Sequence, residues 1–469
     1  MENSNLDHVL ELQRNAVKSG KQKEVHNRIY LLDKLHTTIT QYESQIHQAL
    51  KLDLGKCEAE AFLSESNIVL SEISHVLLKV KKWSKIKRVS TPMASWPGRS
   101  FIQSVPYGMV LIIGPWNYPF QLLMSPLVGA LAAGNVAVLK PSELAPHTSK
   151  VIKKMIDEQF HPSEIAVIEG GIDETTYLLD QKFDYIFYTG STRVGKIIMK
   201  KASEHLTPVT LELGGKSPCV VLEDIDIDVA AKRIVWGKLF NNGQTCVAPD
   251  YLLLQESIYD RFLEKLKTVT LDFYQNPETS LDYGRIVNSS HFKRLVSYLS
   301  NVKIISGGKS DAKINYIEPT LVQSTSQDKI MDEEIFGPIL PVIKIKDLNE
   351  AIKIINDRAH PLALYLFSES KHNQQILLNK TQSGGVCLND TLVHMSGEFL
   401  PFGGVGESGM GSYHGEQSFR TFSHQRAVMK KFFKFDLALR YPPYSRKIGF
   451  MKLVIALLEK ITLLLSKLF

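Results

Sequence analysis

Cys246 is the residue whose surroundings best fit a chemical reaction. It lies in the segment FNNGQTCVAPDY (240–251), where polar residues follow an expected helix. A lone cysteine is most often a small buried apolar residue, and that interpretation suits Cys219 and Cys387, which stand inside apolar runs. A nucleophilic thiol instead needs a polar, accessible site in which it can become a thiolate. The context therefore favours a nucleophile at Cys246.

Glu212 interrupts the apolar, strand-like segment VTLELGG (209–215). Burying a carboxylate costs free energy unless the group is paired or has a function. Burial also raises its pKa, so that it can act as a general base near neutral pH. Gly214 and Gly215 follow and allow a ligand to approach the backbone. The alternative is a salt-bridged glutamate at the end of a strand, and the residues alone leave both interpretations open.

A glycine turn lies between an expected strand and an expected helix in YIFYTGSTRVGK (185–196). Such a turn lets backbone N–H groups meet a phosphate at the positive end of the helix. The spacing of Gly190 and Gly195 differs from the GxGxxG fingerprint, so a simple tight connection is an equal alternative. Lys140 and Glu143 follow another expected strand, at the sheet edge where α/β proteins bind ligands, but by themselves they fit a solvated pair.

Short apolar runs that alternate with helical segments surround these residues. This alternation predicts βαβ units and parallel sheets in two α/β halves, after about a hundred mostly helical residues. The glycine-rich segment 402–415 is expected to be a long ordered loop. The expected strands are 109–113, 136–139, 165–169, 185–188, 209–213, 219–222, 251–255, 302–306 and 339–345, and the expected helices include 121–133, 147–160, 226–240 and 258–273.

The composition is that of a globular protein with a large core. The chain has 469 residues, of which 44% are hydrophobic and 22% charged, which excludes a mainly disordered protein. The length indicates two or three domains. Four scattered cysteines exclude a disulfide scaffold, and none of their spacings fits a metal site, which favours a reducing, cytosolic compartment. The polar N-terminus is not expected to be a signal peptide.

The positive charge is concentrated near the C-terminus. Residues 426–469 contain ten Lys or Arg and two acidic residues, so this segment has a net charge of +8 and the remaining chain −2. Such a body is not expected to bind nucleic acid. In the segment 448–469, Lys452, Lys460 and Lys467 share one helical face and the apolar residues the other, which favours an interfacial helix over a membrane span. Docking on the protein itself or on a partner subunit is an equal alternative.

Seven segments together resemble the NAD(P)-dependent aldehyde dehydrogenase superfamily, and they stand in that family's order. CVAPDY after the cysteine and RYPPY (440–444) most resemble the class 3 and fatty aldehyde dehydrogenase branch. The resemblance covers about residues 5–447. It implies an α/β protein with a Rossmann-like coenzyme domain, a related catalytic domain and a small bridging element. The segments are GPWNYP (114–119), LKPSE (139–143), YTGSTRVG (188–195), TLELGGKSP (210–218), FNNGQTCVAPDY (240–251), EEIFGP (333–338) and PFGGVGESGMG (401–411).

The resemblance also implies roles for individual residues. Cys246 would attack the aldehyde, the Asn117 amide and the Cys246 backbone N–H would hold the oxyanion, and Glu212 would activate the water that hydrolyses a thioester. Trp116 and Tyr118 would line the substrate channel, and no metal is expected. Residues implied to hold the dinucleotide are Lys140, Glu143, Gly190, Ser191, Gly195, Glu334 and Phe336.

The expected function is the NAD(P)-dependent oxidation of apolar, medium- to long-chain aldehydes to carboxylic acids. Glu143 would repel a ribose 2′-phosphate, which favours NAD, although NADP use stays open. The alternatives are an acylating relative, which generally lacks a base at the position of Glu212, and a non-catalytic membrane-binding relative.

The resemblance further implies a homodimer. The expected location is the cytoplasm, and the helix 448–469 could give the protein a peripheral position on the inner face of the membrane. The expected parts are a coenzyme domain with N-terminal helices (1–208), a catalytic domain (209–396), a return segment with the bridging element (397–447) and the amphipathic helix (448–469).

Overall fold

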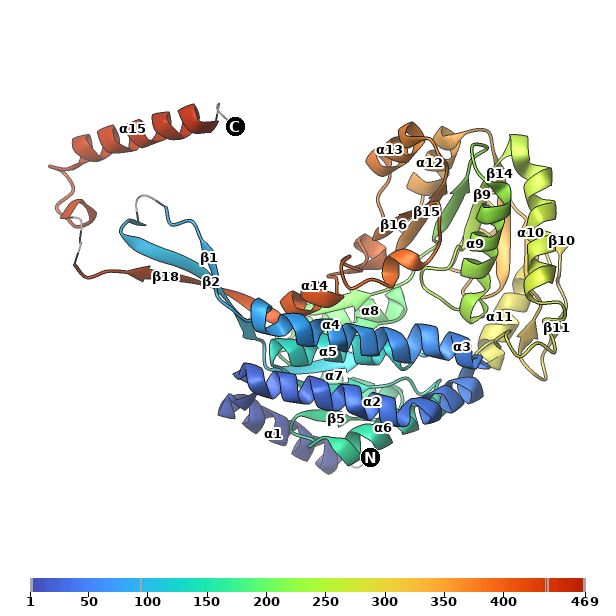
Figure 1. Ribbon diagram of the computed structural model, residues 1–469, viewed down its shortest axis with the longest axis horizontal. Coiled ribbons are helices and arrows are strands. Elements are labelled where there is room, and N and C mark those ends of the chain that lie inside the picture. The colour runs from blue at the N-terminus through green and yellow to red at the C-terminus, as the bar shows by residue number, and fades with distance from the viewer. Residues whose placement is uncertain (1–2, 93–94, 435, 437, 467–469) are drawn as a thin grey trace. The chain divides into compact units, whose positions relative to one another are not determined.

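The computed structural model describes residues 3–92, 95–434, 436 and 438–466 (Figure 1). The chain divides into two units. The first consists of residues 1–85 and 104–424, and the second of residues 86–103 and 425–469.

A six-stranded sheet in the first unit contains most of the predicted coenzyme-binding strands. Its order is β17-β7-β6-β3-β4-β5, and all neighbours are parallel except β17 with β7. The central strands are buried along their whole length, because helices cover both faces of a parallel sheet. The strands are β3 (Met109–Ile113), β4 (Val136–Lys140), β5 (Ile165–Val167), β6 (Tyr185–Thr189), β7 (Val209–Glu212) and β17 (Gly409–Met410).

Helices of two kinds surround this sheet. The crossover helices are α5 (Gln121–Ala133), α6 (Pro146–Gln159), α7 (Ile172–Leu179) and α8 (Thr192–Ser203). The N-terminal helices are α1 (Asn3–Ser19), α2 (Val25–Leu54), α3 (Glu58–Ala61) and α4 (Asn67–Trp83), with a π-helical turn at Phe62–Ser66. Helix α2 packs on α4, α5 and α6 through a buried apolar stripe, which confirms the predicted helical N-terminus (Figure 1).

A second, seven-stranded sheet has the order β10-β13-β14-β9-β8-β15-β16, with β10 antiparallel at one edge. Its strands are β8 (Pro218–Val221), β9 (Tyr251–Gln255), β10 (Lys303–Ser306), β13 (Thr320–Gln323), β14 (Ile339–Ile345), β15 (Ala363–Phe367) and β16 (Gly385–Leu388). The associated helices are α9 (Ile227–Leu239), α10 (Tyr259–Phe273), α11 (Ser289–Leu299), α12 (Leu348–Asn356) and α13 (Lys371–Lys380). The α/β class with parallel sheets is therefore confirmed, although the sequence analysis did not predict β13, β15 and β16.

The glycine-rich segment 402–415 is mostly irregular, as expected, but it contains strand β17. Gly409 of β17 lies opposite Glu212 of β7, so this loop closes the edge of the sheet beside that carboxylate. The segment then leads into helix α14 (Gly415–Thr421). Because β7 pairs with β6, the expected boundary between residues 208 and 209 would cut the six-stranded sheet. We propose that the boundary between the two α/β domains follows β7.

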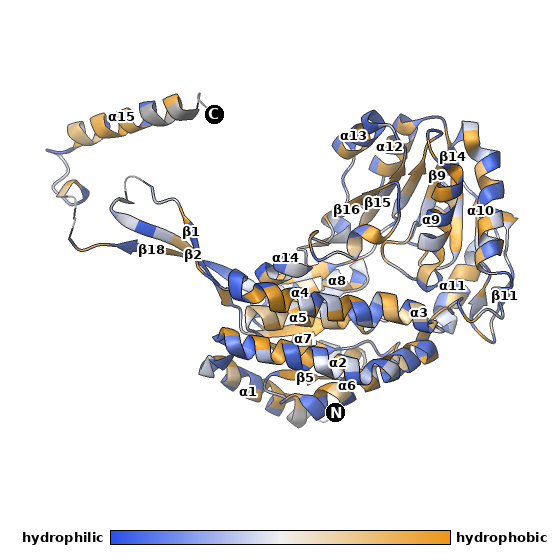
Figure 2. Ribbon diagram, in the orientation of Figure 1, coloured by the Kyte–Doolittle hydropathy of each residue, from blue (hydrophilic) through white to orange (hydrophobic). Residues whose placement is uncertain are grey.

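The second unit contains parts of a three-stranded sheet and the C-terminal helix. The strands are β1 (Lys87–Val89), β2 (Gly98–Pro106) and β18 (Ser423–Lys431), in the order β1-β2-β18. Helix α15 covers Ile448–Ser466, and the apolar residues along it are visible in Figure 2. Lys467, which belongs to the predicted polar face, lies outside the described residues. No helix in the described part of the chain is long and apolar enough to cross a membrane.

Candidate active site

A cleft of about 850 Å³ opens at the carboxyl ends of β3 and β6. From β3 the chain continues to β4 and β5 on one side, and it then returns to β6 and β7 on the other. Open α/β sheets bind ligands where the strand order reverses in this way. The cleft is lined by Trp116 and Asn117, which follow β3, and by Gly190 and Ser191, which follow β6. Two motifs that are far apart in the sequence therefore meet at one site.

The three expected catalytic residues all line this cleft. Glu212 is the last residue of β7 and is 2% exposed, and neither of its carboxylate oxygens has a hydrogen-bond partner among the described residues. Cys246 is a partly buried free thiol. Asn117 is buried, and its Nδ2 donates a hydrogen bond of 3.0 Å to the Gln244 carbonyl. An amide NH₂ has two hydrogens, so one stays available for a ligand.

Burial changes the protonation of this group. It raises the pKa of Glu212 well above the ordinary value of a glutamate. Burial also raises the pKa of the Cys246 thiol, and the nearby Glu334 and Glu212 carboxylates raise it further. Low-dielectric surroundings disfavour the charged form of both groups. Burial therefore favours the neutral form of the Cys246 thiol and raises the proton affinity of the Glu212 carboxylate.

Glu334 and Phe336 belong to a loop that also lines the cleft. Burial raises the pKa of Glu334 to about 8. A Cβ on Gly214 would collide with the Glu334 carboxylate, so this glycine gives the carboxylate its room. Phe336 packs edge-on against Trp116, with 5.3 Å between the ring centroids. The aromatic pair thus forms one wall of the cleft beside a carboxylate.

Charged side chains that the sequence analysis did not select hold this loop. Lys216 pairs with Asp250 and donates to the Ile330 and Glu333 carbonyls. Arg294 donates to the Glu334 carbonyl at 3.2 Å and to the Ile335 carbonyl at 2.7 Å. A local pattern could not reveal these roles because each contact joins distant parts of the sequence.

The start of α8 has the features of a phosphate site. Ser191 caps the helix by accepting a hydrogen bond from the Val194 N–H, and no acidic residue stands in the first turn. A Cβ on Gly195 would lie 2.8 Å from Leu213, so the glycine lets α8 pack closely beside the end of β7. Free N–H groups and the helix dipole favour an anion at this end. The cleft therefore fits the pyrophosphate of a dinucleotide.

Lys140 is the last residue of β4, the strand beside β3, and Glu143 follows it; neither is among the residues that line the cleft. Lys140 is buried, and its Nζ donates to the carbonyls of Pro141 at 2.8 Å and Gly170 at 2.6 Å. The same Nζ lies 3.9 Å from the half-exposed Glu143 carboxylate. Burial lowers the pKa of Lys140. The pair thus lies at the same sheet edge as the cleft, next to the strand-order reversal.

Tyr118 was expected as a channel wall, but it is buried outside the lining of the cleft. Its hydroxyl lies 2.6 Å from the Thr245 hydroxyl, and its ring lies 3.9 Å from the Lys56 ammonium. Trp116, by contrast, does line the cleft. Tyr118 therefore connects the segment of Asn117 to the segment of Cys246.

A family model described as the aldehyde dehydrogenase family matches residues 1–428. The chain belongs to the aldehyde dehydrogenase family. It is therefore an oxidoreductase that acts on aldehydes. The seven motifs that carried the resemblance lie within the matched residues.

Relatives of this aldehyde dehydrogenase support the predicted branch. The chain is 50% identical to a 4,4′-diaponeurosporen-aldehyde dehydrogenase of Staphylococcus aureus, over 92% of this chain and 95% of the relative. It is 46% identical to mouse aldehyde dehydrogenase family 3 member A2, over 92% of this chain and 90% of the relative. It is 46% identical to a canine dimeric NADP-preferring aldehyde dehydrogenase, over 95% and 99%. The class 3 assignment is thereby confirmed.

A solved structure confirms the fold of this aldehyde dehydrogenase. The substrate-bound Staphylococcus aureus AldH superposes with a TM-score of 0.94 at 47% identity, over 96% of this chain and 99% of that chain.

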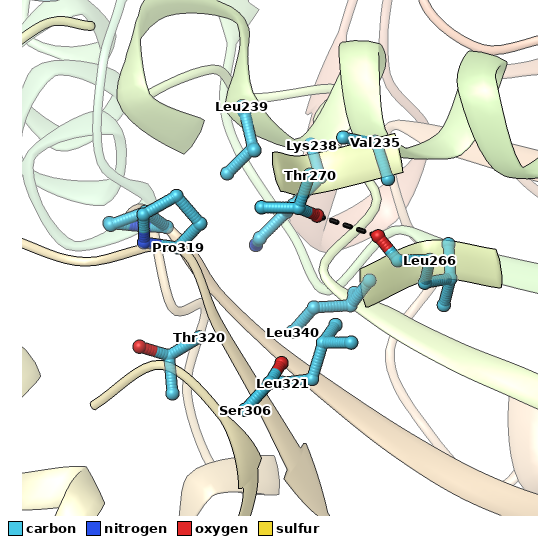
Figure 3. Close-up of a pocket in the computed structure, with 11 residues that line it drawn as sticks. Val235, Lys238, Leu239, Leu266, Thr270, Ser306, Pro319, Thr320, Leu321 and Leu340 are labelled. Atoms are coloured by element: carbon cyan, nitrogen blue, oxygen red, sulfur yellow. Dashed lines mark hydrogen bonds between the residues drawn. The ribbon is translucent and has the colours of Figure 1, made fainter. Parts of the chain in front are cut away.

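The enzyme also contains a small cavity of about 20 Å³ between α9, α10, β13 and β14 (Figure 3). The Lys238 Nζ at this cavity has no hydrogen-bond partner among the described residues, and burial lowers the pKa of Lys238 to about 8. The volume suffices for a single water molecule. Within the described residues, no group of His, Cys, Asp and Glu side chains could hold a metal ion.

Proposed function

We propose that the protein oxidises apolar, medium- to long-chain aldehydes to carboxylic acids through a thioester on Cys246. The observation that carries this proposal is the cleft itself, which brings Cys246, Glu212 and Asn117 together at the reversal of the strand order. The buried Glu212 carboxyl group, which has no partner among the described residues, gives this site a base that a merely structural cleft would not need.

The first half of the reaction would take place on Cys246. The thiol gives its proton to solvent, the sulfur forms a bond with the aldehyde carbon, and the carbonyl oxygen becomes an oxyanion. The free Nδ2 hydrogen of Asn117 and the Cys246 backbone N–H are the donors that would hold this charge. When bound, the nicotinamide dinucleotide supplies the acceptor for the hydride that leaves the carbon. Cys246 is then left as a thioester.

The second half of the reaction would depend on Glu212. Its carboxylate takes a proton from water, the resulting hydroxide attacks the thioester carbon, and the acid leaves as the sulfur is released. The raised pKa of Glu212 makes it a better base than an exposed glutamate. Transfer of the acyl group from Cys246 to coenzyme A or phosphate would need no base that activates water. Glu212 therefore favours hydrolysis over acyl transfer.

We also propose how this chain holds the dinucleotide. Gly190, Ser191 and Gly195 would receive the pyrophosphate at the start of α8, and Glu334 and Phe336 would contact the nicotinamide ribose. Lys140 and Glu143 would hold the adenine ribose, where the Glu143 carboxylate disfavours a 2′-phosphate. This charge favours NAD, while the NADP preference in the name of the canine relative keeps NADP as a second cofactor.

The substrate proposal is tested by a rate screen. NADH or NADPH formation would be measured over straight-chain aldehydes of increasing length, with NAD⁺ and NADP⁺ in parallel. We expect kcat/KM to rise with chain length, because each further methylene group buries more apolar surface in a channel for apolar aldehydes. Equal values for short and long chains would contradict the apolar specificity. Turnover that requires coenzyme A or phosphate would contradict hydrolysis.

We further propose a homodimer and a peripheral membrane location on the cytoplasmic side. One relative is named dimeric, which supports the first proposal. The second rests on α15, where Phe450, Leu453 and Leu457 are between 57% and 67% exposed. Ten Lys or Arg in residues 426–469 would add attraction to anionic lipid.

A further inference from the structure

A buried ion pair lies behind the Asn117 backbone. Lys56 follows α2, Glu65 lies in the π-helical turn Phe62–Ser66, and both side chains are fully buried. The Lys56 ammonium forms an ion pair with the Glu65 carboxylate. Removing two charges from water is costly, and apolar residues of similar volume often give equal stability. The pair therefore has to be explained by what it contacts.

Both charges contact the Asn117 segment directly. The Lys56 Nζ donates to the Asn117 carbonyl at 3.0 Å. The second oxygen of Glu65 accepts hydrogen bonds from the Phe120 N–H at 3.1 Å and the Gln121 N–H at 2.9 Å. The pair thus holds the backbone on both sides of Tyr118 and Pro119. Its position leaves this short turn little freedom to move.

The same network reaches the segment that carries Cys246. The Asn241 Nδ2 donates to the Asn117 carbonyl at 2.9 Å and to the Gln244 carbonyl at 3.1 Å. Asn117 itself donates to that Gln244 carbonyl. These hydrogen bonds therefore hold the Asn117 amide in place relative to the backbone just before Cys246. The Lys56–Glu65 pair supports the same segment from behind.

We propose that Lys56 and Glu65 are positioning residues that orient the Asn117 amide toward the oxyanion formed on Cys246. The inference rests on the proposed function, because it assigns a purpose to the orientation of Asn117 in that reaction. Neither residue touches the reacting atoms. Their effect on the reaction passes through the Asn117 carbonyl and the backbone at the start of α5. Substituting either residue should therefore slow the reaction only when the Asn117 amide is present.

The test is a double-mutant cycle in the full-length enzyme. Lys56→Met with Glu65→Gln removes both charges without leaving one unpaired, and it is made with and without Asn117→Ala. Removing an oxyanion donor is expected to slow the hydride step by about 10²- to 10³-fold. The charge-free pair should displace the Asn117 donor by a fraction of an ångström, which should slow the hydride step by about 10- to 100-fold. In the Asn117→Ala background, the two substitutions should slow the hydride step by less than about a further twofold.

Two further measurements separate positioning from general damage. The KM for NAD⁺ and the rate at which iodoacetamide alkylates Cys246 should stay within about twofold of the wild type, since neither uses the oxyanion donor. Leu50→Ala, a cavity variant in the buried stripe of α2, is the stability control and should not slow the hydride step. If the charge-free pair does not fold, Lys56→Arg replaces it; this variant keeps the charge but not the geometry of the ammonium, so it should slow the hydride step in the presence of Asn117 but not further in Asn117→Ala.

The outcomes distinguish this inference from the proposed function. Additive losses in the cycle would overturn the positioning role while the oxyanion role of Asn117 stands. Equal slowing in Leu50→Ala would overturn it as well, because the effect would then be one of stability. If Asn117→Ala alone leaves the hydride step unchanged, the proposed mechanism and this inference both fail.

Discussion

The cleft and helix α15 each present side chains to an environment that does not suit them. In the cleft, the carboxyl group of Glu212 is buried with no partner among the described residues. On α15, apolar residues such as Leu453 and Leu457 are exposed to water. Both arrangements cost free energy in the isolated protein. We propose a partner for each: a water molecule for the Glu212 carboxylate, and an apolar lipid surface for α15.

The largest effect that we expect is on the cleft side of this comparison. Cys246→Ala should reduce aldehyde oxidation by at least about 10⁴-fold, because the covalent route is lost. Stopped-flow measurement of NADH formation checks the rate, and fluorescence titration checks that NAD⁺ still binds. Appreciable turnover in this variant would remove Cys246 from the mechanism.

The next effect separates the two halves of the reaction. Glu212→Gln should slow deacylation by about 10²- to 10⁴-fold while hydride transfer survives, so that an acyl-enzyme accumulates. Mass spectrometry after a single turnover should find one acyl group per chain, attached to Cys246. Release of the acid at the wild-type rate would contradict the role of Glu212 as the base.

The raised pKa of Glu212 predicts a direction of pH dependence. The base works only when ionised, so the deacylation rate should rise by about tenfold per pH unit below its apparent pKa and then level off. Burial raises the folded-state pKa above the unfolded one, so ionising Glu212 at higher pH should also lower the free energy of unfolding. Rate–pH profiles and urea melts of the wild type and Glu212→Gln check both trends. If the deacylation rate of Glu212→Gln rises with pH in the same way as that of the wild type, the pH dependence belongs to another group.

The smallest effect on catalysis should come from the tail. Deleting residues 448–469 should change kcat/KM for short soluble aldehydes by less than about twofold, but it should release the protein from anionic vesicles. Each basic residue near the lipid surface contributes about 1 kcal/mol, and apolar burial adds to this. Co-sedimentation of both forms with anionic liposomes at low and high salt measures the effect.

The controls for the tail separate its two candidate partners. Leu453→Ser with Leu457→Ser keeps every charge and removes apolar surface, so it should weaken binding at both salt concentrations. Equal sedimentation of the full-length and truncated forms would exclude the membrane role. Dissociation or aggregation after truncation would instead favour a helix docked on the protein or on a partner subunit.

The sequence by itself determined many of the buried strands and singled out the candidate nucleophile and base. Strands such as 109–113 and 251–255 could be predicted because a strand buried on both faces must be a continuous apolar run. Glu212 stood out because a carboxylate interrupts such an apolar run, whereas Cys246 stood out because polar residues surround it, which is unusual for a structural cysteine.

Only the tertiary structure decided which distant groups support that reaction. Lys56 lies 61 positions from Asn117, and Glu65 lies 55 positions from Phe120, so no periodic pattern connects them. For the same reason, Tyr118 was expected in the channel wall, whereas the fold buries it. The expected domain boundary likewise fell before β7, whereas β7 pairs with β6 in the six-stranded sheet. Periodicity encodes which face of a segment is buried, but the partner of a buried charge depends on how the elements pack.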